Sequence, residues 1–223
     1  MRYLIVVDMQ NDFVTGSLGS KMAEMIVPAV CEKIRNYKAQ GSTVFMTLDT
    51  HFKDYLETPE GKKLPVEHCI KGTEGWQPET QVAEAIGGSA EVYEKSTFGS
   101  TELAQHLAEI TKAGDEIELC GLCTDICVVS NALLIKAFCP ECEVIVDANA
   151  CAGVTEENHK AALVTMAPYI YCLETSPIFP IAMTNISSVT PKPTSQRCIP
   201  DSDLSAFCER DIDIRAYLRL IIN

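Results

Sequence analysis

Positive charge is scarce in this chain. Its 223 residues include 18 Lys and Arg against 31 Asp and Glu, which gives a formal net charge of −13. Basic clusters and long apolar runs are also lacking, so neither nucleic-acid phosphates nor a membrane interior is an expected partner. The amino terminus begins a strand pattern that leads into Asp8, unlike a secretory signal. We therefore expect a cytoplasmic protein.

Internal repeats, low-complexity blocks and, before residue 185, interdomain linkers are absent as well. Cysteine, by contrast, is plentiful, with eleven residues. Their odd number and irregular spacing do not fit a secreted disulfide framework. Cys139-x-x-Cys142 has no second pair nearby, and Cys120-x-x-Cys123 is typical of buried packing. We expect reduced thiols.

Apolar strand patterns alternate with helical patterns along most of the chain. Strands are predicted at 2–8, 42–48, 90–94, 116–122 and 142–147, and helices near 21–39, 79–86, 101–113, 125–138 and 155–166. This alternation predicts a single-domain, three-layer α/β/α fold with a mostly parallel central sheet. We assign residues 1–173 to this domain and 174–223 to a C-terminal extension of unknown structure.

Cys127 is the first candidate nucleophile. An apolar strand pattern runs through Gly121 into a helix cap and then reaches this cysteine. A helix N-terminus carries unpaired N–H groups and a partial positive charge, which favour a thiolate and can hold an oxyanion. Taken alone, the segment favours a buried core cysteine, and only the other candidate residues of the chain reverse that preference.

Two further polar residues follow strand patterns. Asp8 ends the apolar run Tyr3–Val7, where open α/β sheets bind ligands, and it is a candidate general base. A turn-forming aspartate is the alternative. Lys95 ends the pattern that begins at Glu91 and can supply the cation that lowers a thiol pKa. Lys71 competes for that role, although no strand fixes its Gly-rich loop.

A candidate metal set follows the second strand pattern. Asp49-x-His51 comes directly after the apolar run, and the next loop carries Glu60 and His68. These four residues offer a mixed set of nitrogen and oxygen donors for a divalent ion. The other two histidines fall in helical patterns and are interpreted as surface or helix-packing residues: His106 and His159.

Together these motifs resemble the isochorismatase-like cysteine hydrolases, and among them the nicotinamidases most. The likeness spans roughly residues 2–166 and rests on five segments in the family's order: Val7–Phe13, Asp49–His51, Leu64–Cys69, Glu94–Lys95 and Gly121–Cys127. Five separate motifs in one order argue against a chance match.

The resemblance implies a catalytic triad of Asp8, Lys95 and Cys127. Asp8 would take the thiol proton, and Lys95 would stabilise the thiolate that attacks a carboxamide carbonyl. Ammonia would leave with that proton, and water would then hydrolyse the thioester. The resemblance also implies a cis Leu122–Cys123 peptide bond and an oxyanion hole built from the backbone N–H groups of Cys123 and Cys127.

The same resemblance implies one divalent metal ion. Zinc is the expected ion, and iron and manganese are the alternatives. Its ligands would be Asp49, His51, Glu60 and His68, and the ion would bind the substrate's ring nitrogen or position water. Glu60 fits a subset of nicotinamidases with glutamate as the third ligand; Glu57 and Glu67 are its rivals.

The implied activity is hydrolysis of a small amide. The expected reaction converts nicotinamide to nicotinate plus ammonia, a step of NAD metabolism. Phe13 matches an aromatic that lines the family's pocket, whereas Leu64 and Pro65 stand where a second aromatic is expected. N-carbamoyl or ureido substrates, isochorismate-type vinyl ethers, and non-catalytic binding on the same fold are the alternatives. Isochorismate hydrolysis needs neither the cysteine nor the metal, so the presence of both argues against it. A scaffold needs no triad, so the three triad residues argue against a non-catalytic role. Formation of a homo-oligomer stays open.

Overall fold

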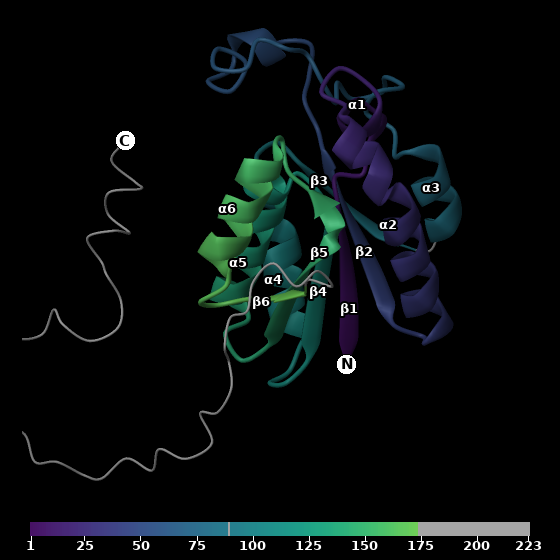
Figure 1. Ribbon diagram of the computed structural model, residues 1–223, viewed down its shortest axis with the longest axis vertical. Helices are drawn as coiled ribbons and strands as arrows, with labels where there is room; N and C mark the ends of the chain where they lie inside the picture. The colour runs from purple at the N-terminus through teal and green to yellow at the C-terminus, as the bar shows by residue number, and fades with distance from the viewer. Residues whose placement is uncertain (89, 174–223) are drawn as a thin grey trace, which may run out of the picture. The chain divides into compact units, whose positions relative to one another are not determined.

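A six-stranded parallel sheet runs through the centre of the protein (Figure 1). The computed structural model describes residues 1–88 and 90–173, so the extension assigned to 174–223 lies outside the described residues. The strands are β1 (Arg2–Val7), β2 (Thr43–Asp49), β3 (Glu91–Lys95), β4 (Glu116–Leu122), β5 (Glu143–Ala152) and β6 (Tyr171–Leu173). They pair in the order β3-β2-β1-β4-β5-β6, and every pair is parallel.

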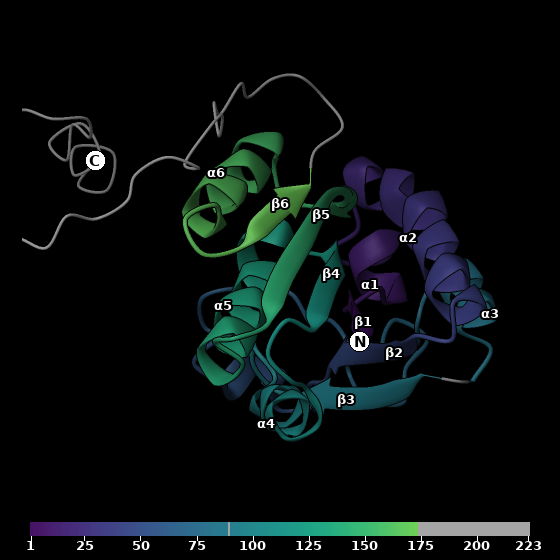
Figure 2. The same cartoon turned by 90° about the horizontal axis from the view of Figure 1, so that it is seen from below.

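Helices cover both faces of this sheet, as the view from below shows (Figure 2). One face carries α1 (Asn11–Val14), α2 (Lys21–Ala39) and α3 (Thr80–Ile86); the other carries α4 (Thr101–Ile110), α5 (Val129–Phe138) and α6 (Glu156–Met166). The predicted single-domain α/β/α fold is therefore confirmed. Among the described residues, no helix is both long and apolar enough to cross a membrane.

Local sequence explains where the main helices begin. Ser20, Ser100 and Thr155 cap α2, α4 and α6, because each side-chain oxygen accepts a hydrogen bond from the backbone N–H three residues further on. The central strand β1 is equally well explained, since Tyr3–Val7 is buried throughout, as a parallel strand covered on both faces requires.

The sequence-based element boundaries differ from the structure at a few points. β5 continues to Ala152, beyond the predicted end at residue 147, because its register with β4 shifts between Leu119 and Gly121 and pairing then resumes. Two short elements were not predicted: α1, and a 3₁₀ turn η1 (Tyr55–Glu57). Both are too short to show a hydrophobic period.

The strand order reverses between β1 and β4. From β1 the chain proceeds outward through β2 and β3, and it then returns to place β4 on the opposite side of β1. In open α/β sheets, ligands bind at this topological switch point, outside the carboxyl ends of the strands. Asp8 directly follows β1, and Cys127 lies shortly beyond the end of β4.

Gly121 allows β4 to approach β1 closely at this point. Its φ of +119° is unfavourable for a side-chain-bearing residue, and a Cβ atom here would overlap the carbonyl oxygen of Val7. Gly114 is a useful comparison, because its φ is +82° but a Cβ atom would have nothing within 4 Å.

We expect Gly121→Ala to lower the free energy of unfolding by more than about 2 kcal/mol, because it adds a main-chain clash to the dihedral cost. The control Gly114→Ala bears the dihedral cost alone, about 1 kcal/mol. Urea unfolding followed by circular dichroism measures both variants. Equal losses would contradict the close-approach explanation.

Candidate active site

The parallel register brings three strand ends together. Asp49 pairs with Lys95 at the last position of β2 and β3, while Val7 pairs with Thr47 on one side and Gly121 on the other. Asp8, one residue past β1, therefore faces the ends of both neighbouring strands. Its φ of +47° is unusual for a residue other than glycine.

Asp8, Lys95 and Cys127 meet in the buried interior, and Cys127 also lines a pocket. The Lys95 ammonium Nζ lies 2.7 Å from Oδ2 of Asp8 and 3.5 Å from Sγ of Cys127. The other oxygen of Asp8, Oδ1, accepts a hydrogen bond of 2.7 Å from the Thr47 hydroxyl. All four residues are buried. The carboxylate is thereby oriented by a hydroxyl on one side and an ammonium on the other.

Burial dominates the ionisation of these groups. It raises the pKa of the Cys127 thiol well above its ordinary value, and Asp8 adds to that rise while Lys95 opposes it. It also raises the pKa of Asp8 against the charge of Lys95. Burial alone would lower the pKa of Lys95, but the facing Asp8, Cys127 and Asp49 raise it. Burial and the facing carboxylate Asp8 therefore disfavour the thiolate form of Cys127, whereas its position near a helix start favours that form.

The turn that carries Cys127 is a π-helical segment, η2 (Thr124–Val128), which leads directly into α5. The expected cis peptide bond between Leu122 and Cys123 immediately precedes it. Asp125 links this turn to the β5–α6 connection and to α6, because its carboxylate accepts hydrogen bonds from Val154 N (2.9 Å) and Asn158 Nδ2 (3.1 Å).

Asp49, His51 and His68 form a compact, buried donor set. One ligand atom from each lies within 4.8 Å of the others. Nε2 of His51 is 3.0 Å and Nε2 of His68 is 3.5 Å from Oδ2 of Asp49. Oε1 of Glu60 lies 3.7 Å and 3.9 Å from the same two nitrogens. The rivals Glu57 and Glu67 are both exposed.

The chemistry of this donor set fits a divalent cation. Nδ1 of His68 contacts the carbonyl oxygen of Val66 at 2.8 Å, which leaves the lone pair of Nε2 directed at the set. Nε2 of His51 is buried, and within the described residues it makes no well-formed hydrogen bond. Burial opposes ionisation of Asp49, but His51, His68 and Lys95 hold its pKa well below the usual range. Nitrogen lone pairs converging on a carboxylate suit zinc or a similar ion.

The loop that supplies these donors is held by side chains that follow β1. The Gln10 amide donates to Asp49 O (2.9 Å) and accepts from Asp49 N (2.8 Å). Oδ2 of Asp12 accepts from Cys69 N (2.7 Å), directly beside His68. Since η1 is the one short helical element recorded between β2 and α3, these contacts replace regular structure in orienting the donors.

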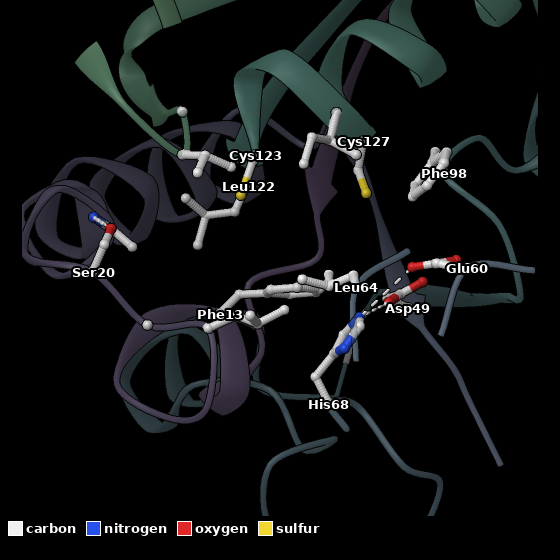
Figure 3. A pocket seen from close by; sticks show the side chains of 16 residues that line it. Phe13, Ser20, Asp49, Glu60, Leu64, His68, Phe98, Leu122, Cys123 and Cys127 are labelled. Carbon is white, nitrogen blue, oxygen red and sulfur yellow. Dashed lines mark hydrogen bonds and ion pairs between the residues drawn. The ribbon is translucent and has the colours of Figure 1, made fainter. Parts of the chain in front are cut away.

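The pocket lined by Cys127, Asp49 and His68 has a volume of about 440 Å³ and a largely apolar lining (Figure 3). Phe13 forms part of its wall and packs against His68, with ring centroids 5.5 Å apart. Leu64 lines it too, in the region where a second aromatic was expected. Phe98 supplies an aromatic wall that the sequence analysis missed; its one signal was its place three residues after Lys95.

The competitor of Lys95 and the two remaining histidines make other contacts. Lys71 is exposed and pairs with Glu94. His106 packs edge-on against Phe45, with ring centroids 5.7 Å apart. His159, on α6, contacts the Thr124 hydroxyl through Nδ1 at 2.8 Å. The last two positions agree with helix packing.

Comparisons with known proteins identify a family and relatives that match this chain. Residues 2–176 match the isochorismatase domain family. A nicotinamidase/pyrazinamidase of Mycobacterium tuberculosis is 30% identical over 182 residues, which cover 74% of this chain and 94% of that protein. An isochorismatase-family protein of Bacillus subtilis is 30% identical over 178 residues, which cover 72% of this chain and 91% of the relative. The crystal structure of a pyrazinamidase of Pyrococcus horikoshii in complex with zinc has a TM-score of 0.66 at 27% identity, covering 78% of this chain and 98% of that one.

The parallel sheet, its switch-point pocket and these relatives define a hydrolase of the amidase type on a doubly wound α/β fold. The chain belongs to the isochorismatase family. The resemblance drawn from its motifs is thereby confirmed.

Proposed function

We propose that the protein hydrolyses nicotinamide, or a closely related aromatic carboxamide, to the carboxylate and ammonia through a thioester at Cys127. The observation that carries the proposal is the meeting of Asp8, Lys95 and Cys127 beside the Asp49 donor set, with Cys127 and Asp49 on the pocket lining. The relatives named nicotinamidase and pyrazinamidase support the same substrate class.

In the first step, Asp8 accepts the thiol proton as Sγ of Cys127 attacks the amide carbon. Lys95 stays close to both groups and stabilises the negative charge wherever it resides. The carbonyl oxygen becomes an oxyanion, which we assign to the backbone N–H groups of Cys123 and Cys127. Asp8 then returns the proton to the nitrogen, the C–N bond breaks, and ammonia leaves a thioester.

In the second step, water attacks the thioester carbon while Asp8 accepts one of the water protons. The C–S bond breaks, and the sulfur of Cys127 recovers a proton, so the acid product and the free thiol are formed. The flat ring of the substrate would pack against Phe13 and Phe98. We assign Asp49, His51 and His68, with Glu60, to a divalent ion, which when bound supplies a Lewis-acid contact for the ring nitrogen or for water.

We expect Cys127→Ala to lower ammonia release from nicotinamide to background, because alanine offers no nucleophile. The matched control is Cys139→Ala, which removes another buried thiol just beyond the far end of α5 and outside the pocket. Coupled ammonia detection, with nicotinate confirmed by chromatography, measures both.

Turnover that survives the loss of Cys127 would reject the nucleophile. Activity confined to N-carbamoyl or ureido compounds in a parallel panel would keep the mechanism and change the substrate. Absence of turnover on every amide would favour a binding role.

We expect the purified protein to hold about one equivalent of a divalent metal, since four donors are sufficient for a zinc site. His68→Ala should lose most of that metal, measured by plasma mass spectrometry after dialysis. Glu60→Gln should lower metal affinity on the order of 10–100-fold if Glu60 contacts the ion or a bound water. Glu67→Gln, at an exposed position, is the matched control.

Equal metal retention in Glu60→Gln and Glu67→Gln would remove Glu60 from the ligand set. Full retention in His68→Ala would reject the site itself. Both outcomes are read from metal content and need no assay of turnover.

A further inference from the structure

Asn131 is a buried amide at the third position of α5, four residues beyond Cys127. Its Nδ2 donates hydrogen bonds to the carbonyl oxygens of Cys127 (2.8 Å) and Phe98 (3.1 Å). Its Oδ1 accepts a hydrogen bond from Ser100 N (2.9 Å). Both N–H donors of the amide are therefore used. One side chain joins the main chain of the nucleophile to the β3–α4 loop.

That loop connects two parts of the site. It begins after Lys95, carries Phe98 on the pocket wall, and ends at Ser100, whose side chain caps α4. At Gly99 the loop packs tightly on α5, because a Cβ atom there would lie 3.3 Å from Leu134 Cδ2 and 3.5 Å from the carbonyl oxygen of Ser130. The Asn131 bonds lie on either side of this contact and fix the loop against the helix.

Loss of the Asn131 amide would be costly because the groups that it binds are buried. Without the amide, two carbonyl oxygens and one N–H would lose their partner in an interior where an unsatisfied polar group costs about 1–3 kcal/mol. The backbone would have to move to recover a partner. A displacement of about 1 Å at a reacting group can cost on the order of 100-fold in rate.

We propose that Asn131 is a positioning residue that fixes the Cys127 main chain and the Phe98 wall relative to each other, and so sets how the site accepts a flat aromatic amide. This rests on the proposed function. Asn131 touches neither the substrate nor the reacting atoms; it acts through Cys127 and Phe98.

Asn131 holds the main chain of Cys127 and also holds the β3–α4 loop. Two substitutions separate these two effects. Asn131→Leu has a similar size and removes all three hydrogen bonds. Asn131→Thr loses the reach to the loop but keeps a hydroxyl that can donate to the carbonyl four residues back in a helix, which here is that of Cys127. Ser130→Ala is the matched control, because Ser130 Oγ donates to Ile126 O (2.6 Å) in the same way without a bond to the loop.

We expect Asn131→Thr to raise the KM for nicotinamide about tenfold with kcat within about threefold of the wild type, because only the loop is released. Asn131→Leu should raise KM similarly and also lower kcat about tenfold or more. Ser130→Ala should leave both constants within about twofold. Alkylation of Cys127 by iodoacetamide, followed by peptide mass spectrometry, should change in rate at least about threefold in Asn131→Leu alone.

Wild-type KM values in both Asn131 variants would overturn the proposal. An equal rise of KM in Ser130→Ala would overturn it too, as would altered unfolding stability with unchanged kinetics. If the wild type does not hydrolyse nicotinamide, the proposed function fails, yet alkylation still tests the positioning of Cys127: an unchanged rate in Asn131→Leu would overturn that part separately.

Discussion

The buried ammonium of Lys95 is the interaction on which the site depends. Its side chain is 2% exposed, with Asp8 at 2.7 Å and Asp49 at 3.2 Å. A charge removed from water to this extent must be paired, because its desolvation costs several kcal/mol. Two carboxylates exceed one ammonium by one negative charge, and Glu60 lies close by. A divalent cation at Asp49 would offset this excess, so the triad and the donor set behave as one electrostatic unit.

In the proposed mechanism, the same pairing lets a buried thiol with a raised pKa act as a nucleophile. Full ionisation of Cys127 by loss of its proton to water would leave a second negative charge beside Asp8. Transfer of that proton to Asp8 only moves the negative charge from oxygen to sulfur, and Lys95 lies within 3.5 Å of both. The net charge of the triad does not change, so the low-dielectric interior does not oppose the transfer.

Much of this site could be predicted from the sequence because its ionisable members follow strands. Strand patterns that end at Asp8, Asp49 or Lys95 identify residues at one edge of a parallel sheet, which the register confirms. The carboxylate that accompanies the two histidines and Asp49 could not be selected in this way. Glu60 differs from Glu57 and Glu67 only through the path of a loop without a hydrophobic period, and only the structure brings it within 4 Å of both histidines.

Phe98 and Asn131 show a different limit. Neither is ionisable, and Asn131 sits in a helical pattern where a polar residue normally faces solvent. Its complete burial arises because the β3–α4 loop packs over α5, a contact between segments that local patterns do not record. Once buried, an amide must find partners for both N–H groups, and the acceptors here are the carbonyls of Cys127 and of Phe98. The requirement to satisfy one buried side chain thus couples the main chain of Cys127 to the Phe98 wall of the pocket.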